Sequence, residues 1–375
     1  MNVDWLIVGA GLSGATLAER IASQRGESVL IVEKRDHIAG NAYDEYNEFG
    51  ILEHKYGPHI FHTNSTDIWQ YLSQFTEWRP YFHKVLASID GQLVPVPFNL
   101  NSLDKIFPQK LAERYTEKLV SHYGFGSRVP ILKMRETHDE DLRDLADFVY
   151  KKVFENYTFK QWELAPEALS PSVTARVPIL ISRDDRYFQD AYQAMPLFGY
   201  TTMVRKMLAH PSIHIMLNTD WQKVKQQISF KRMIFTGPID EYFDYQYGEL
   251  PYRSLDFKTT SLPIEQYQAV ATVNYPNEYL YTRITEQKQL TGQQSNFTTL
   301  LYEYPQPHRV GHTIPYYPIP TEDNKELYAL YRAEAEKVKE QVLFVGRLAN
   351  YMYYNMDQAV AAALAVFRKS IDNVI

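Results

Sequence analysis

The glycine-rich segment Gly9–Gly14 constrains the fold of this chain more than any other feature. It reads Gly-Ala-Gly-Leu-Ser-Gly and directly follows Asp4–Val8, a short apolar run that predicts a buried strand. Residues 15–23 then have the pattern of a helix, and residues 28–32 predict a second strand that ends at Glu33. A strand, a glycine turn, a helix and an acid about twenty residues on form a dinucleotide-binding unit. The sequence therefore predicts a Rossmann-like α/β domain.

Each residue type in this segment has a physical role. Gly9 permits the tight turn, Gly11 lets a phosphate approach the backbone, and Gly14 lets the helix pack close to the strand. The N–H groups at the helix start then face a pyrophosphate, and Glu33 can accept hydrogen bonds from both ribose hydroxyls. The alternative is a glycine-rich turn with an incidental acid, which the surrounding strand and helix disfavour.

Two further segments favour FAD over NAD as the dinucleotide. Arg35-x-x-Ile38-x-Gly40-Asn41 follows the acid closely and resembles the second-strand extension of FAD-binding folds. Val342–Arg347, followed by a helix, resembles their C-terminal flavin-contact strand, so we expect the C-terminus to complete the N-terminal sheet. The chain carries a single dinucleotide fingerprint, whereas a flavoprotein reductase with its own NADPH domain normally carries two.

The C-terminal helix carries a capping signal at its start. Asn355 can cap it, and Gln358 stands three residues later, as in a capping box. The partial positive charge of this helix start would stabilise an anionic reduced flavin at its pyrimidine edge. The alternative is an ordinary capped helix.

Composition excludes several classes of function. The chain has no cysteine, so disulfides, thiolate metal sites and cysteine nucleophiles are ruled out. Its net charge of −6 argues against general nucleic-acid binding. No apolar run reaches membrane-span length and no signal peptide is visible at the N-terminus. His59-x-x-His62 lacks a nearby third ligand, so we expect no metal. The 29 tyrosines suggest a wet, aromatic-lined site, although tyrosine also fills interfaces.

Patterning along the chain predicts three parts. The fold class is α/β, with a discontinuous Rossmann-like FAD-binding domain, a small helical domain and an antiparallel β-sheet substrate domain. Leu93–Phe98 predicts an edge strand or extended turn, because its prolines cannot donate to a central ladder. Further strands are predicted at 267–272 and at 279–284, the latter with Tyr279, Tyr281 and Arg283 on one face. The predicted domains are 1–80 plus 196–240 plus 325–375 for FAD, 100–172 for the helices, and 81–99 plus 173–195 plus 241–324 for the substrate sheet.

Several strings resemble the UDP-galactopyranose mutase family, in order and over essentially the whole chain. These are Gly9–Gly14 and residues 33–43, 56–64, 157–162, 237–243, 252–255, 281–283 and 346–349. The resemblance implies a bacterial-type FAD enzyme that interconverts UDP-galactopyranose and UDP-galactofuranose. It implies a reduced-flavin N5–sugar adduct with no net redox change, an external reductant for the flavin, a cytoplasmic location and a homodimer.

The resemblance also implies roles for individual residues. Arg176, on a lid-like loop, and Arg283 would bind the diphosphate, since each guanidinium can fork onto phosphate oxygens; a lone arginine is otherwise a solvated surface residue. His62 and Arg347 would face the flavin, and the catalytic residues would be Arg176, Arg283 and His62. Phe154, Tyr157, Thr158 and Trp162 would hold uridine, although Tyr157 and Trp162 at this spacing also suit a core. The remaining substrate positions are Asn274, Tyr187, Tyr317 and Tyr353. The cofactor positions are Gly9, Gly11, Leu12, Ser13, Gly14, Glu33, Lys34, Arg35, Gly40, Asn41, His59, Ile60, Gly237, Gly346, Arg347, Asn355 and Met356.

Alternatives to this function remain at the sequence level. A flavin amine oxidase or desaturase shares the fold, but would need an apolar substrate tunnel, which the arginines and tyrosines disfavour. A nucleotide-sugar-binding or flavin-sensing module is the non-enzymatic alternative. Many members of the resembled family have Asp where this chain has Asn355, and Asn where it has His83. The sugar therefore stays open between galactose, N-acetylgalactosamine and a TDP-linked deoxysugar.

Overall fold

A computed structural model describes residues 2–170 and 177–372 of the chain. The chain forms two compact units, and both are assembled from separate stretches of sequence. Unit 1 comprises Met1–Pro80, Asp190–Ser254 and His308–Ile375, and unit 2 comprises Tyr81–Gln189 and Leu255–Pro307. The finer division into three domains stays a prediction.

Unit 1 is built on a five-stranded parallel sheet in the order β12-β2-β1-β13-β19. The four residues of β2, Val-Leu-Ile-Val, are all buried, as expected for a parallel strand covered on both faces. The return of the C-terminal strand β19 to this sheet confirms the expectation from sequence. The strands are β1 (Asn2–Val8), β2 (Val29–Val32), β12 (Ile213–Met216), β13 (Ser229–Phe235) and β19 (Val342–Phe344).

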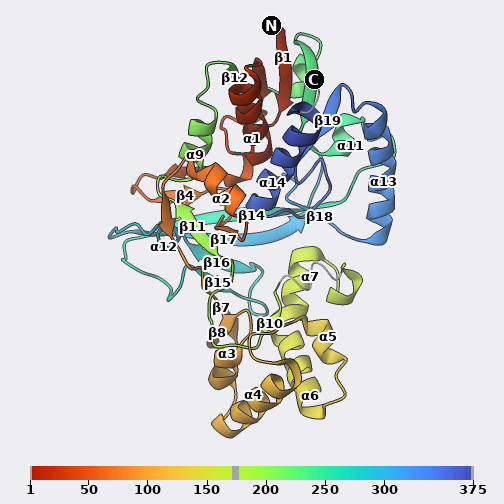
Figure 1. Ribbon diagram of the computed structural model, residues 1–375. Coiled ribbons are helices and arrows are strands. Elements are labelled where there is room, and N and C mark those ends of the chain that lie inside the picture. Colours follow the sequence, from red (N-terminus) through yellow and green to blue (C-terminus); the bar gives the residue numbers. More distant parts are fainter. Residues whose placement is uncertain (1, 171–176, 373–375) are drawn as a thin grey trace. The chain divides into compact units, whose positions relative to one another are not determined.

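Helices from both ends of the chain meet in unit 1. Helix α1 (Leu12–Arg20) follows β1 and packs beside α14 (Met356–Val366), as Figure 1 shows. Each continues as a π-helical turn, at Ile21–Arg25 and Phe367–Asp372. The other elements of unit 1 are β3 (Asp44–Tyr46), β4 (Leu52–His54), β5 (Phe61–Thr63), α2 (Thr66–Ser73), β6 (Trp78–Pro80), β11 (Tyr192–Pro196), α9 (Tyr200–Met207), α10 (Trp221–Val224), α11 (Ile239–Tyr242), β18 (Tyr317–Pro318) and α13 (Glu322–Lys337).

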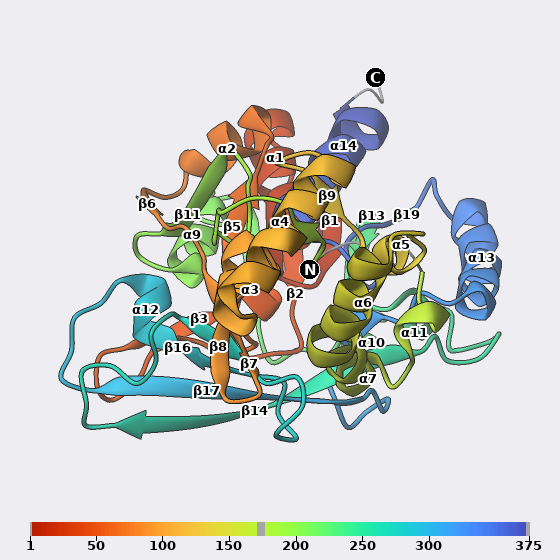
Figure 2. The same cartoon turned by 90° about the horizontal axis from the view of Figure 1, so that it is seen from below.

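Unit 2 contains a mostly antiparallel sheet in the order β14-β17-β16-β15-β7-β8. Its longest strands, β14 and β17, are neighbours (Figures 1 and 2). β8 lies at the end of the order, which confirms the predicted edge strand and explains why Pro95 is tolerated there. The strands are β7 (Val85–Ile89), β8 (Gln92–Val96), β14 (Tyr252–Leu262, whose first three residues belong to unit 1), β15 (Thr272–Asn274), β16 (Arg283–Glu286) and β17 (Thr298–Pro307).

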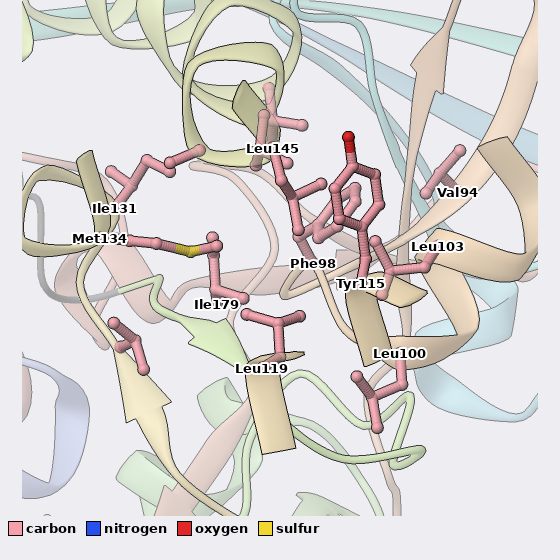
Figure 3. Packing of buried hydrophobic residues seen from close by; sticks show 14 of the residues in the cluster. Val94, Phe98, Leu100, Leu103, Tyr115, Leu119, Ile131, Met134, Leu145 and Ile179 are labelled. Carbon is pink, nitrogen blue, oxygen red and sulfur yellow. The ribbon is translucent and has the colours of Figure 1, made fainter. Parts of the chain in front are cut away.

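The helices of unit 2 bury a common core with β7 and β8. Figure 3 shows side chains from both parts in contact, among them Val94, Phe98, Tyr115 and Leu145. The apolar stripe predicted between residues 139 and 161 supplies Leu142, Leu145, Ala146 and Val149 to this core. The remaining elements are α3 (Leu100–Ile106), α4 (Gln109–Tyr123), β9 (Arg128–Val129), α5 (Ile131–Arg135), α6 (Glu140–Val149), α7 (Asn156–Trp162), β10 (Ile179–Leu180) and α12 (Gln287–Thr291).

Two predicted strands in unit 2 are wrong in position. The segment predicted as 267–272 is an irregular run before β15, because its backbone N–H groups bond a side chain instead of a strand. The N–H groups of Tyr267 and Gln268 each donate at 3.0 Å to the buried carboxylate of Glu286. The segment predicted as 279–284 enters a strand only at Arg283, so Tyr279 and Tyr281 lie in a loop, with their rings stacked at 4.7 Å.

Candidate functional site

The glycine loop in unit 1 packs the start of α1 tightly onto the end of β1. A Cβ on Gly14 would lie 2.1 Å from the carbonyl oxygen of Gly9, so only glycine fits there. A Cβ on Gly40, at φ +57°, would lie 2.9 Å from the Cα of Gly11. Gly11 caps α1 without any side-chain hydrogen bond, which leaves the first N–H groups of the helix available to an anion.

A pocket in unit 1 opens at this loop. Ile60 and His62 lie outside the lining set of the described residues. Sixteen of the seventeen predicted cofactor positions line it, namely Gly9, Gly11, Leu12, Ser13, Gly14, Glu33, Lys34, Arg35, Gly40, Asn41, His59, Gly237, Gly346, Arg347, Asn355 and Met356.

Glu33 and Arg35 show how one wall of the pocket suits a ribose and a phosphate. The Glu33 carboxylate accepts the N–H of Ala10 on one oxygen and that of Arg35 on the other, both at 2.9 Å. A carboxylate has about four acceptor sites, so two stay available for ribose hydroxyls. The Arg35 Nη2 donates to Asn41 at 2.9 Å, while its Nη1 is buried with no hydrogen-bond partner among the described residues. A buried guanidinium nitrogen of this kind fits an anionic ligand.

The start of α14 supplies another part of the pocket. The Asn355 N–H donates to Gln358 Oε1 at 2.9 Å, which confirms the predicted capping interaction. Asn355, Met356 and Ala359 all line the pocket, and the Ser13 hydroxyl donates to the Ala359 carbonyl at 3.5 Å. Two helix N-termini, those of α1 and α14, thus border one cavity. Their partial positive charges favour a ligand with negative charge in two places, and FAD with its pyrophosphate and reduced ring fits that demand.

Arg347 joins this pocket to two of the predicted substrate tyrosines. Its guanidinium carbon lies 5.6 Å from the ring centre of Tyr317 and 5.7 Å from that of Tyr353. The two rings meet edge to face at 4.8 Å. The Arg347 Nη2 also donates to the Tyr354 carbonyl at 2.6 Å, which fixes the side chain. Unit 1 therefore brings a predicted flavin-facing arginine together with two predicted substrate tyrosines.

The sequence reasoning missed several residues of this pocket. Glu241 lies in it, and burial raises the pKa of its carboxyl while the charge of Lys34 opposes the rise. The rule that ligands bind at the carboxyl ends of parallel strands would have pointed to the segments after β12 and β13. The missed lining residues include Thr219, Asp220, Trp221, Pro238, Glu241, Ile314 and Pro315.

His62 has a polar partner in unit 1. It lies on β5, and its Nδ1 is 3.1 Å from Asp190 Oδ2. The Asn64 side chain donates to the other oxygen of Asp190 at 2.9 Å. Its predicted place beside the flavin stays a prediction.

Three predicted or charged side chains form a row across the sheet of unit 2. Asn274 on β15 pairs in register with Arg283 on β16, which pairs with Glu303 on β17. Both the Nε and Nη2 atoms of Arg283 donate to one oxygen of Glu303, at 2.9 and 2.7 Å. The Glu303 side chain is only 2% exposed, whereas that of Arg283 is 25% exposed. The Asn274 Oδ1 is buried with no hydrogen-bond partner among the described residues. The row therefore offers a fixed cation and a polar group on one face.

The predicted uridine residues lie on and just before α7. Tyr157 and Thr158 are half-buried, while Trp162 is buried, as the core alternative expected for it. Phe154 packs against the helical core. Elsewhere in unit 2, the Tyr187 ring lies edge-on to His83 at 5.8 Å.

Arg176 and its loop lie outside the described residues. Within residues 2–170 and 177–372, no three His, Asp or Glu side chains gather as a metal site would require. The helices of that same range include none long and apolar enough to cross a membrane.

Known proteins similar to this chain point to one family. A model of UDP-galactopyranose mutases matches residues 152–353, and one of NAD(P)-binding Rossmann-like domains matches residues 7–75. A probable UDP-galactopyranose mutase of Klebsiella pneumoniae is 35% identical, over 100% of this chain and 96% of that protein. A dTDP-fucopyranose mutase of Escherichia coli is 32% identical, over 98% of both. The crystal structure of a reduced UDP-galactopyranose mutase has the same fold, with a TM-score of 0.71 at 16% identity, over 98% of this chain and 96% of the other. The chain belongs to the UDP-galactopyranose mutase family.

Proposed function

We propose that this enzyme interconverts UDP-galactopyranose and UDP-galactofuranose with FAD as its cofactor and without net redox change. The observation that carries the proposal is the pocket of unit 1, where two helix N-termini and Glu33 converge in a chain matched end to end by a mutase. An amine oxidase or desaturase activity has no comparable support from sequence, because the two relatives named above, each at least 32% identical to this chain, are mutases.

The residues of unit 1 would bind and orient FAD. The N–H groups at the start of α1 and the Arg35 guanidinium would hold the pyrophosphate, and Glu33 the ribose. The start of α14 and Arg347 would border the ring system. Reduced FAD, once bound, supplies a nucleophilic N5 for the anomeric carbon of the sugar, so the chain needs no nucleophile of its own.

The residues of unit 2 would bind the nucleotide part of the substrate. Tyr157 offers an aromatic face for uracil, and Arg283 a guanidinium for the diphosphate. Glu303 holds that guanidinium in one orientation before substrate arrives, which lowers the entropy lost on binding. Arg176 is proposed as the second diphosphate arginine.

A mutase for another nucleotide sugar is the second candidate, because the dTDP-fucopyranose mutase matches this chain over nearly its full length. Asn355 and His83 are the positions at which we expect sugar contacts to differ. Asn355 lines the pocket, and His83 is buried with its Nδ1 3.0 Å from the Tyr81 hydroxyl.

The experiment is a panel of nucleotide sugars incubated with chemically reduced and with oxidised protein. UDP-galactofuranose, UDP-N-acetylgalactosamine and dTDP-fucopyranose would be separated from their ring isomers by chromatography. Conversion of UDP-galactofuranose only by reduced protein supports the proposal. Preferred conversion of a different sugar supports the second candidate, and no conversion of any sugar would refute both.

The proposal also includes a homodimer, an external electron donor for the flavin and a cytoplasmic location. These follow from the family resemblance. Light scattering of the purified FAD-loaded protein tests the oligomeric state, and a mass of 43.8 kDa per particle would exclude the dimer.

A further inference from the structure

The loop between β15 and β16 in unit 2 lies between two predicted substrate residues. Asn274 precedes it and Arg283 follows it. The Tyr275 N–H donates to the Thr282 carbonyl at 2.8 Å and closes the loop at its neck. The Thr282 N–H donates to the Glu303 carbonyl at 2.9 Å, which fixes that neck to β17. Any group that bonds this loop is therefore coupled to the Asn274–Arg283–Glu303 row.

Three side-chain hydrogen bonds join the same loop to the segment around α7. The Lys160 Nζ donates to the Tyr275 carbonyl at 2.9 Å. The Asn277 Nδ2 donates to the Lys152 carbonyl, and its Oδ1 accepts from the Asn156 Nδ2, both at 2.9 Å. Asn277 thus bonds two points of this segment, Lys152 before α7 and Asn156 at the first residue of α7.

The junction itself is a π-helical turn, Tyr150–Glu155, between α6 and α7. A π-turn has one residue more than an α-turn, so it rotates everything after it by about 100° about the helix axis. That rotation decides which way Tyr157 and Thr158 face. The Asn277 side chain donates to the Lys152 carbonyl, a backbone group of this turn.

We propose that Asn277 and Lys160 are positioning residues that hold the nucleoside-binding helix α7 in register with the diphosphate-binding row Asn274–Arg283–Glu303. Neither side chain needs to touch the substrate. Their effect is to let one rigid UDP molecule meet both sets of residues at once, which increases affinity without any new contact. The inference rests on the proposed function, because it assumes a ligand with a base at one end and a diphosphate at the other.

The test compares UDP with uridine as ligands of the FAD-loaded protein. The variants are Asn277→Ala, Asn277→Asp and Lys160→Met, and a fluorescent UDP analogue serves as the displaced probe. Asn277→Asp keeps the acceptor for Asn156 but loses the donor to Lys152. Each variant loses one or two hydrogen bonds, so we expect UDP to bind about two- to tenfold more weakly. Uridine affinity should stay within about twofold, since it uses α7 alone.

Two controls separate a loss of alignment between α7 and the Asn274–Arg283–Glu303 row from general damage to the fold. Gln294→Ala removes an exposed amide in another loop of unit 2 and should leave UDP affinity unchanged. Asp90→Asn removes an exposed carboxylate that pairs with Lys152 at 2.7 Å, and should also have little effect because the pair is at the surface. FAD content and melting temperature identify any variant that fails to fold, in which case Asn277→Asp decides.

Three outcomes would overturn the inference. Unchanged UDP affinity in both Asn277 variants shows that the register does not depend on this side chain. An equal loss of affinity for UDP and for uridine shows that Asn277 affects the conformation of α7 itself and not its alignment with the row. Failure of wild-type protein to bind UDP would instead refute the proposed function, and the inference with it. The expected selective loss of UDP affinity, with a raised KM and a nearly unchanged kcat, supports it.

Discussion

Replacing Arg283 with alanine will separate two roles of this guanidinium, one in unit 2 itself and one toward substrate. In the structure the Arg283 guanidinium donates two hydrogen bonds to Glu303, whose side chain is 2% exposed. Removing one partner of a buried ion pair costs roughly 3–5 kcal/mol, because the other charge stays buried and unpaired. The Arg283 side chain is 25% exposed, so water will reach the gap. We therefore expect a cost of about 2–3 kcal/mol in unfolding free energy, below that range because of this exposure.

That cost translates into a measurable change in melting temperature. For a unit of 150–250 residues, 1 kcal/mol corresponds to about 2–4 °C, so Arg283→Ala should melt about 4–12 °C lower than wild type. On the proposed function, the same change also removes a charged hydrogen bond to the diphosphate, worth about 1.5–3 kcal/mol, or roughly ten- to hundredfold in UDP affinity and in kcat/KM. Arg283→Lys should restore only part of this loss, because an ammonium cannot fork across two oxygens.

The double variant Arg283→Ala, Glu303→Gln tells the two roles apart. The neutral amide that replaces the Glu303 carboxylate leaves no buried charge, so the melting temperature should recover most of the loss, while UDP affinity should stay low. The assays are thermal melting and UDP titration of FAD-loaded protein, with kcat/KM from chemically reduced enzyme. FAD content should stay normal, because Arg283 and the pocket belong to different units. UDP affinity within about twofold of wild type in Arg283→Ala would refute the substrate role of Arg283.

Three further predictions concern the cofactor, the redox cycle and pH. Purified protein should be yellow and release FAD on denaturation. Gly14→Ala, whose Cβ would lie 2.1 Å from the Gly9 carbonyl oxygen, should lose FAD and lower the melting temperature of the apoprotein, whereas Gly11→Ala, with its nearest atom at 3.7 Å, should lose FAD but keep that temperature. Normal FAD content in both variants would contradict a phosphate-binding role of the glycine loop. One reduction of the flavin should support many rounds of sugar interconversion, and consumption of one reductant per product, followed spectrophotometrically, would favour an oxidoreductase. Burial raises the pKa of Asp240 from 3.8 to about 6, so the folded state binds the proton more tightly than the unfolded state. The free energy of unfolding therefore falls by up to about 3 kcal/mol as the pH rises from about 4 to 6. Asp240→Asn should therefore match wild type below about pH 4 and be more stable above about pH 6 by thermal melting; an equal difference at both pH values would contradict this.

The glycine loop and the edge strand were predictable because the forces that shape them are local. Gly9–Gly14 stands between a buried strand and a helix, and Gly14 is required because a Cβ there would lie 2.1 Å from the carbonyl oxygen of Gly9 in the same loop. Pro95 lacks a donor wherever it lies, which confines it to an edge. The Asn355–Gln358 bond spans three residues. The misplaced strand near Tyr267 failed for the opposite reason: the buried Glu286 carboxylate, eighteen or more positions along the chain, takes the N–H groups that a strand would have used. The strand predicted from Tyr279 begins only at Arg283.

The sequence by itself determined the Rossmann-like fold, the nucleotide pocket and the family. Sixteen of its predicted cofactor positions line one cavity, since strand, turn and helix patterns specify which backbone ends meet at the edge of a parallel sheet. Only the tertiary structure decided that Arg347 faces Tyr317 and Tyr353, and that Arg283 is held by a buried Glu303. It also placed Trp221 and Glu241 in the pocket and bonded Asn277 to the turn before α7. These contacts join residues from different strands and helices, and no local propensity or periodicity encodes a partner that folding alone brings near.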